Sequence, residues 1–156
     1  MTQSRILSIS EIKAMVGEEI GCSSWTRISQ EMIDIFAELT NDNQFIHVDP
    51  ERAKSETSYG GTIVHGFLCL SLASQMVRSA IPRIKDINIS INYGFDKIRF
   101  VTPVPSGSDI RGRFKLMAVD ERKPKEFVMR YEMKIEIRGG DRPAIFAEWL
   151  VQLNLQ

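Results

Sequence analysis

Residues 62–80, TIVHGFLCLSLASQMVRSA, form the segment that most restricts how this chain can fold. As far as about Val77, an α-helix over this stretch would carry apolar side chains on nearly every side. A helix that is apolar all round is normally buried. A membrane-spanning helix needs roughly 20 consecutive apolar residues, and this run is shorter. We therefore expect a buried helix, with another part of the chain wrapped around it.

The second half of the chain supplies the wrapping layer. Its segments are rich in Ile, Val, Phe and Tyr and alternate between apolar and polar residues, which is typical of β-strands. They span residues 87–100, 108–120, 125–138 and 142–154, with turn sequences between them. Helices followed by a run of long antiparallel strands indicate an α+β fold. No linker or repeat interrupts the chain, which predicts a single domain over residues 1–156.

The first half is predicted to hold shorter elements. The predicted helix N-caps are Ser8 (in a capping box with Glu11), Ser29 and Asp49 (which precedes Pro50). Gly17 is expected to end the first helix, and residues 19–27 are interpreted as one short strand. Asn41 suits the left-handed conformation that ends the second helix. The residues from Asp42 onward are therefore expected to be irregular.

Charge and cysteine content exclude several classes of protein. Twenty basic residues balance twenty acidic ones, so the summed charge favours neither nucleic acid nor an anionic membrane. Cys22 and Cys69 are too few and too far apart for a disulfide framework or a zinc site. Reduced thiols and the absence of a signal-peptide pattern favour a soluble, cytoplasmic protein.

Asp42 and His47 are the first candidates for chemistry. In a non-helical segment, two titratable groups five residues apart can turn towards one point. A carboxylate beside an imidazole can hold a water molecule and exchange protons with it near neutral pH. The alternative is structural: Asp42 would cap a turn and His47 would be a packing residue.

Gly66 and Ser74 lie on the predicted buried helix. With Thr62 as N-cap, Gly66 falls in the first turn, where backbone N–H groups lack helical partners and a glycine lets a ligand oxygen approach. Gly66 equally suits tight packing of the helix on the sheet. Ser74 has a similar alternative, because a serine on a buried helix often bonds back to its own backbone. No phosphate-binding loop, nucleophile elbow or metal-ligand motif is present, and two histidines 18 residues apart make a poor metal site.

Two segments together carry a resemblance to a known family. FAELTNDNQFIHVDPERA and GGTIVHGFLCLSLAS resemble the MaoC-like family of (R)-specific enoyl-CoA hydratases and dehydratases, most nearly the nodulation protein N-like branch. The family motif is Gly-Asp-x-Asn-Pro-x-His, and this chain departs from it at Asn41, Gln44 and Phe45. Asn41 retains the tolerance for a left-handed conformation, and Gln44 retains an amide that can hydrogen-bond.

The resemblance implies a fold and a reaction. The fold is a single hot-dog domain, in which a curled antiparallel sheet wraps a long central helix. The reaction is the reversible addition of water to a trans-2-enoyl thioester by a hydro-lyase, without metal or redox cofactor. Asp42 and His47 fall on the catalytic pair, Gly66 on the glycine whose N–H binds the thioester oxygen, and Ser74 on a serine near the site.

The resemblance also implies partners. The substrate would be a thioester of coenzyme A or of acyl carrier protein, and the chain would form a homodimer, which covers an exposed sheet edge. Two alternatives stay open. One is a non-catalytic acyl-thioester-binding protein on the same fold. The other is a hot-dog thioesterase, although the helix from His65 to Ala80 has no Asp or Glu to act on the thioester.

Overall fold

A computed structural model describes residues 5–156 of the chain. Its helices are α1 (Ile9–Lys13), α2 (Gln30–Thr40), α3 (Phe45–Val48), α4 (Pro50–Glu56), α5 (Gly66–Ser71) and α6 (Ala73–Ala80). Its strands are β1 (Ile6–Leu7), β2 (Glu19–Cys22), β3 (Thr26–Arg27), β4 (Arg83–Ile84), β5 (Ile87–Phe100), β6 (Asp109–Lys123), β7 (Glu126–Ile137) and β8 (Ile145–Leu155). None of the helices among these residues is long and apolar enough to cross a membrane.

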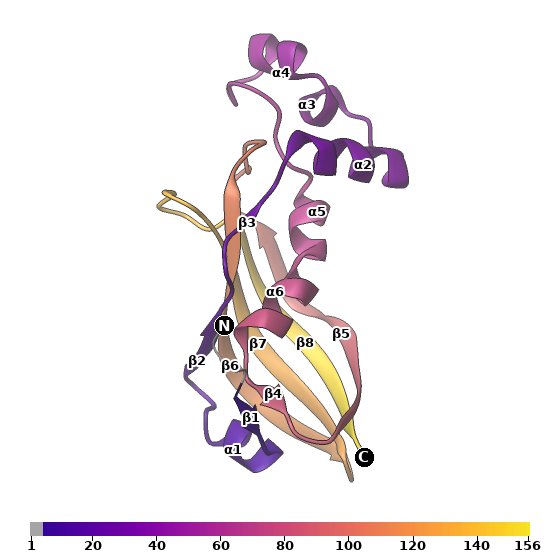
Figure 1. Cartoon of the computed structure of the whole chain (residues 1–156), viewed down its shortest axis with the longest axis vertical. Helices are drawn as coiled ribbons and strands as arrows, with labels where there is room; N and C mark the ends of the chain where they lie inside the picture. The colour runs from indigo at the N-terminus through magenta and orange to yellow at the C-terminus, as the bar shows by residue number, and fades with distance from the viewer. Residues whose placement is uncertain (1–4) are drawn as a thin grey trace.

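One antiparallel sheet dominates the structure, and it curls around α5 and α6 (Figure 1). Its strand order is β2-β6-β7-β8-β5, and β3 also pairs with β6. The four long strands predicted from the sequence are confirmed. The strand β5 pairs with β8, the last strand of the chain, and not with β6, which follows it. This arrangement leaves β5 at one edge of the sheet, with β8 on one side only.

The strand predicted over residues 19–27 is two strands, β2 and β3, so that prediction is wrong in detail. The pairing with β6 is interrupted at Ser23, whose hydroxyl accepts the hydrogen bond that the Gly112 N–H donates, at 2.9 Å. A side chain thus takes the place of a backbone partner in the ladder.

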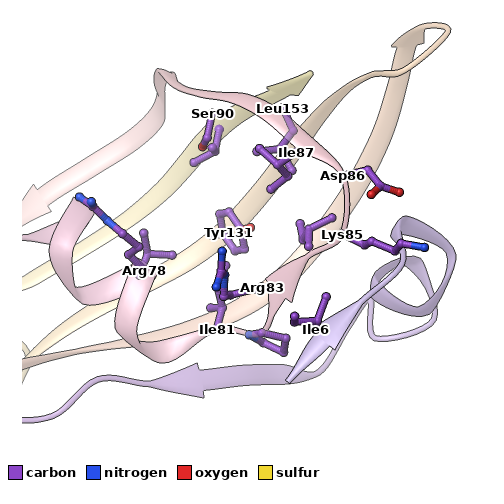
Figure 2. A pocket seen from close by; sticks show the side chains of 14 residues that line it. Ile6, Arg78, Ile81, Arg83, Lys85, Asp86, Ile87, Ser90, Tyr131 and Leu153 are labelled. Carbon is purple, nitrogen blue, oxygen red and sulfur yellow. The ribbon is translucent and has the colours of Figure 1, made fainter. Parts of the chain in front are cut away.

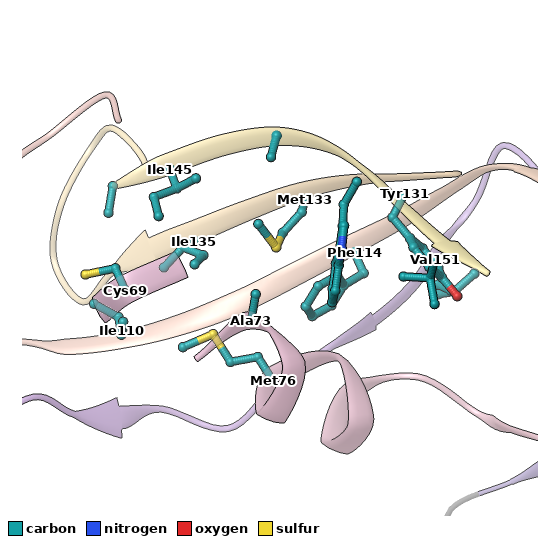
Figure 3. Packing of buried hydrophobic residues seen from close by; sticks show 14 of the residues in the cluster. Cys69, Ala73, Met76, Ile110, Phe114, Tyr131, Met133, Ile135, Ile145 and Val151 are labelled. Carbon is teal, nitrogen blue, oxygen red and sulfur yellow. The ribbon is translucent and has the colours of Figure 1, made fainter. Parts of the chain in front are cut away.

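The predicted central helix also differs from the structure. It is divided at Leu72 into α5 and α6, next to Ser71, whose hydroxyl donates to the Phe67 carbonyl at 2.7 Å. Such back-bonding often bends a helix. Only one side of this helix pair is buried in the single chain, and it packs on the sheet through Cys69, Ala73 and Met76 (Figure 3); Leu68 is buried in the same core. Phe67, on another side, is 67% exposed, so the expectation of burial all round is wrong for one chain.

The sheet side of this interface forms the core. Its largest fully buried side chains include Trp149, Tyr131, Phe114, Met129 and Met133. Figure 3 shows several of these residues facing α6 from the strands. Alternate residues of β6, β7 and β8 are buried, as expected for strands with one face towards the core. The core therefore holds α5 and α6 in a fixed position against the sheet.

The helices α2, α3 and α4 gather at one end of the molecule, near the start of α5 (Figure 1). The predicted N-caps are confirmed at Ser8 (with Glu11), Ser29 and Asp49. Asn41 ends α2 in the left-handed conformation, with φ of 57°. The first helix ends at Lys13, earlier than predicted, and Gly17 follows in a turn with φ of 95°.

Candidate functional site

The segment between α2 and α4 turns Asp42 and His47 towards each other. The left-handed turn at Asn41 ends α2, and the Asp42 N–H donates to the Ala37 carbonyl at 3.1 Å. His47 then lies in the single helical turn α3, where its N–H donates to the Gln44 carbonyl at 2.9 Å. The expectation of a fully irregular segment is therefore wrong. A turn of helix after a left-handed residue is what brings the two side chains together.

His47 is held in one orientation. Its side chain is 8% exposed, and its Nδ1 lies 2.7 Å from the Ile63 carbonyl oxygen. Because a carbonyl only accepts, Nδ1 carries the hydrogen, and Nε2 of the neutral ring is left as an acceptor. Burial lowers the pKa of His47 below its ordinary value of 6.5, an effect that the hydrogen bond to Ile63 and the Asp42 carboxylate oppose. The residue is therefore suited to accept a proton near neutral pH.

His65 is a site residue that the sequence analysis missed. It is 3% exposed, and its ring stacks on the His47 ring with centroids 3.8 Å apart and planes 25° apart. Its Nε2 lies 3.0 Å from the Asp42 carbonyl oxygen. The signal in the sequence was slight: His65 is the other of the two histidines and directly precedes Gly66.

Asp42 presents its carboxylate at the surface of this cluster. The side chain is 55% exposed, and Oδ2 lies 4.0 Å from Nε2 of His65. One ligating atom from each of Asp42, His47 and His65 lies within 4.8 Å of the other two. A water molecule that forms hydrogen bonds of about 2.8 Å to two groups can bridge such a gap. The same spacing would admit a cation: Nε2 of His47 is free to coordinate one, whereas Nε2 of His65 already faces the Asp42 carbonyl oxygen.

Gly66 lies in the first turn of α5, as predicted, and is its first residue, but the predicted N-cap is wrong. The N-cap position is His65, while the predicted N-cap, Thr62, donates its hydroxyl to Gln30 Oε1 at 2.5 Å. Among residues 5–156, no backbone acceptor faces the Gly66 N–H. A Cβ on Gly66 would lie 2.7 Å from Cδ1 of Phe100. The glycine thus serves close packing, and it leaves an amide free for a ligand.

A cavity of about 280 Å³ extends between His47 and Gly66, and Asp42 and His65 are not among the residues that line it. His47 and Gly66 both line it, and its other walls are mostly apolar, with Phe67, Cys69, Phe100, Val104 and Ile145 among them. Thr102 is a further lining residue that the sequence analysis missed, and its buried hydroxyl has no hydrogen-bond partner among the described residues. An apolar cavity with a few polar groups at one end is typical of a small-molecule site.

The structure does not bring Ser74 and Gln44 into this cavity. Ser74 lies on α6, where its hydroxyl accepts a hydrogen bond from Asn92 Nδ2 at 3.2 Å, and it lines a separate hollow beside Trp149. Gln44 precedes α3 with an exposed side chain that makes no capping bond. Its contribution to the site is the backbone carbonyl that accepts from His47. A role for either side chain in binding stays a prediction.

A second, larger cavity of about 560 Å³ lies near the end of α6 (Figure 2). Its walls are mainly apolar and include Tyr131, Val151 and Leu153, with Arg78 and Lys85 also beside it. It contains no histidine and none of the predicted site residues. The chemistry of the described chain is therefore concentrated at the start of α5.

Comparisons with known proteins identify the family to which the chain is similar. Residues 11–136 match the family described as "MaoC like domain". Nodulation protein N of Rhizobium leguminosarum bv. viciae is 46% identical over 144 residues, which cover 92% of this chain and 89% of that protein. The 3-hydroxyacyl-thioester dehydratase Z of Mycobacterium tuberculosis (strain ATCC 25618 / H37Rv) is 37% identical over 145 residues, which cover 93% of this chain and 95% of that protein. The solved (R)-hydratase from A. caviae involved in PHA biosynthesis has a TM-score of 0.71 and 27% identity, covering 90% of this chain and 98% of that one.

Proposed function

Because the chain belongs to the MaoC-like dehydratase family and has its hot-dog fold, we propose that it catalyses reversible hydration of a trans-2-enoyl thioester. It would act as an (R)-specific enoyl-CoA hydratase or, in the reverse direction, as a 3-hydroxyacyl-thioester dehydratase. One observation carries the proposal: Asp42 and His47 lie within bridging distance of one water molecule, beside an apolar cavity with a free amide.

The thioester carbonyl accepts a hydrogen bond from the Gly66 N–H. Negative charge grows on that oxygen as the β-carbon is attacked, so a fixed donor stabilises the transition state more than the substrate. The acyl chain beyond the carbonyl contacts the apolar walls of the cavity. Phe100, which packs against Gly66, is one of these apolar walls.

The Asp42 carboxylate and His47 Nε2 each accept one hydrogen of the water molecule. This directs an oxygen lone pair at the β-carbon. As the C–O bond forms, Asp42 and His47 together take one proton from the water, and they deliver that proton to the α-carbon. The hydroxyl and the proton are thus added with no net change in the enzyme, and dehydration is the reverse. We propose that two coupled groups share this proton transfer.

The reaction as proposed needs no metal and no redox cofactor. The charge that develops is met by the Gly66 amide, and the protons move between water, Asp42, His47 and the substrate. The carrier of the acyl group is coenzyme A or acyl carrier protein. The partly exposed Cys22 and the buried Cys69 are free thiols, which suits the cytoplasm.

We also propose that the chain works as a homodimer. Exposed apolar side chains gather along the edge strand β5, where Ile91 is 47% exposed and Tyr93 is 60% exposed. A long apolar edge strand invites pairing with another chain, and a second copy would cover it. Light scattering after gel filtration should show a dimer for the wild type and a monomer for Ile91→Lys. The control is Ile35→Lys on α2, where Ile35 is 59% exposed, and it should remain dimeric.

The test of the activity is the ultraviolet absorbance of crotonyl-CoA and longer 2-enoyl-CoAs during incubation with the pure protein. We expect loss of the enoyl absorbance with wild type and at least a 100-fold slower reaction, on the order expected for lost acid–base catalysis, with Asp42→Asn or His47→Gln. Asp49→Asn is the matched control, because Asp49 caps α4 outside the cluster.

A folded protein inactive on every enoyl-CoA and on every acyl carrier protein substrate would refute a hydratase. Binding of acyl thioesters without turnover would then identify a binding protein, and release of free thiol would identify a thioesterase.

A further inference from the structure

We propose that His65 is a positioning residue of the reaction, which holds Asp42 through its backbone and supports the ring of His47. This inference rests on the proposed function, in which Asp42 and His47 share one water molecule. It adds His65, which contacts neither the water nor the substrate but fixes the distance between Asp42 and His47, which contact the water.

The first contact is a hydrogen bond to the Asp42 backbone. Nε2 of His65 lies 3.0 Å from the Asp42 carbonyl oxygen and 4.0 Å from Oδ2 of its carboxylate. A carbonyl oxygen only accepts, so Nε2 of His65 carries a hydrogen and donates it. Asp42 follows the left-handed Asn41 in an exposed connection, and its own N–H donates to the Ala37 carbonyl on the α2 side. The bond from His65 therefore fixes the point from which the carboxylate extends.

The second contact is the stacked pair of rings. The His65 ring covers one face of His47 at a centroid distance of 3.8 Å, and Phe36 lies 5.1 Å from His65. A ring packed against a face prevents rotation about the side-chain bonds. His47 is thus restrained at its edge by the Ile63 carbonyl and on its face by His65.

The third link is along the backbone. His65 is the N-cap of α5 and directly precedes Gly66. Its carbonyl accepts hydrogen bonds from Leu68 at 3.0 Å and Cys69 at 3.2 Å, which fix it to the first turn of the helix. One residue therefore joins the three working parts: the Asp42 carboxylate, the His47 imidazole and the Gly66 amide.

A purely packing role does not account for a histidine at this position. Nδ1 of His65 is buried and has no hydrogen-bond partner among the described residues. A buried polar atom without a partner destabilises the fold, and a phenylalanine of similar shape would avoid that cost. The only hydrogen bond that the His65 side chain makes within residues 5–156 is the one to Asp42, so that bond is the advantage an imidazole offers over a phenyl ring.

Two substitutions separate the contacts of His65. His65→Phe retains a ring against His47 but has no donor for the Asp42 carbonyl. His65→Gln loses the ring but retains an amide N–H at about the reach of Nε2. We expect His65→Phe to lower kcat by about 10–100-fold, since a misplacement of about 1 Å can cost on the order of 100-fold. KM and the melting temperature should change little, and His65→Gln should recover most of the lost kcat.

Wild-type kcat in His65→Phe would overturn the proposal. The proposal would also be overturned if both variants lost kcat equally and in proportion to their loss of melting temperature. That result would show that His65 has only a structural role.

A second measurement does not depend on activity. The chain has two histidines, so a long-range ¹H–¹⁵N spectrum of the imidazoles shows two rings, and His47→Gln assigns them. We expect opposite tautomers: hydrogen on Nδ1 in His47 and on Nε2 in His65. In His65→Phe, the amide signal of Asp42 and the ring signals of His47 should shift.

The same tautomer in both rings, or an undisturbed Asp42 amide in His65→Phe, would refute the positioning role whether or not the protein is a hydratase. If the protein gives the expected spectra but is inactive on all thioesters, the positioning contacts are supported and the proposed reaction is refuted.

Discussion

The substitution Gly66→Ala tests how one glycine combines packing with catalysis. A Cβ at this position would lie 2.7 Å from Cδ1 and 2.8 Å from Cε1 of Phe100. Carbon atoms in contact are normally ~3.5–4.0 Å apart, so the ring or the helix start must move by about 1 Å. Overpacking of this kind costs ~1–3 kcal/mol in the free energy of unfolding. Loss of one oxyanion donor costs ~100–1,000-fold in kcat.

A double substitution separates the two effects. Phe100→Ala removes the ring that the new methyl group would meet, so Gly66→Ala should destabilise the Phe100→Ala protein much less than the wild type. We expect a coupling of ~1–2 kcal/mol in the free energy of unfolding, measured by urea denaturation. We expect kcat to stay low in the double variant, because the methyl group still stands beside the amide that binds the thioester oxygen.

The single variant Phe100→Ala is the reference for both quantities. Recovery of kcat in Gly66→Ala/Phe100→Ala to the Phe100→Ala value would refute the oxyanion role and leave Gly66 as a packing residue. Additive losses of stability would refute the predicted collision with Phe100.

Three further predictions follow from the contacts of single residues. Because the pKa of His47 is lowered, kcat/KM should stay constant down to a pH below 6.5. The free energy of unfolding should fall as the pH drops below 6.5, because the unfolded chain takes up a proton there before the native one does. This fall should be smaller in His47→Gln. Gly21→Ala should cost at least ~1–3 kcal/mol in urea denaturation, because the new Cβ would overlap the backbone at the end of α6, whereas Gly61→Ala, with open space around it, should be near neutral. Burial raises the pKa of the Cys69 thiol to about 12. Iodoacetamide at pH 8 should therefore alkylate the partly exposed Cys22 in the folded protein and react with Cys69 only after unfolding. Mass spectrometry of peptides would measure both reactions.

Local sequence signals were sufficient wherever the physical cause is local. A serine or aspartate can cap a helix because its oxygen reaches an N–H three residues on, and this holds at Ser8, Ser29 and Asp49. Asn41 adopts the left-handed conformation for which asparagine is suited. Alternation of apolar and polar residues predicted the four long strands. The predictions failed at Thr62 and in residues 19–27, where a side chain bonds to a distant residue instead.

The sequence by itself therefore determined the α+β class, the starts of α1, α2 and α4, and the pair Asp42 and His47, which lie within one short segment. Only the tertiary structure decided which groups join that pair. His65 follows His47 by 18 residues, and it meets Asp42 and His47 because the start of α5 packs beside α3. Ser74 lies on the same helical segment as Gly66, yet it borders a different hollow. Spacing along a chain describes contacts within a turn or two, whereas a site is assembled by packing between elements.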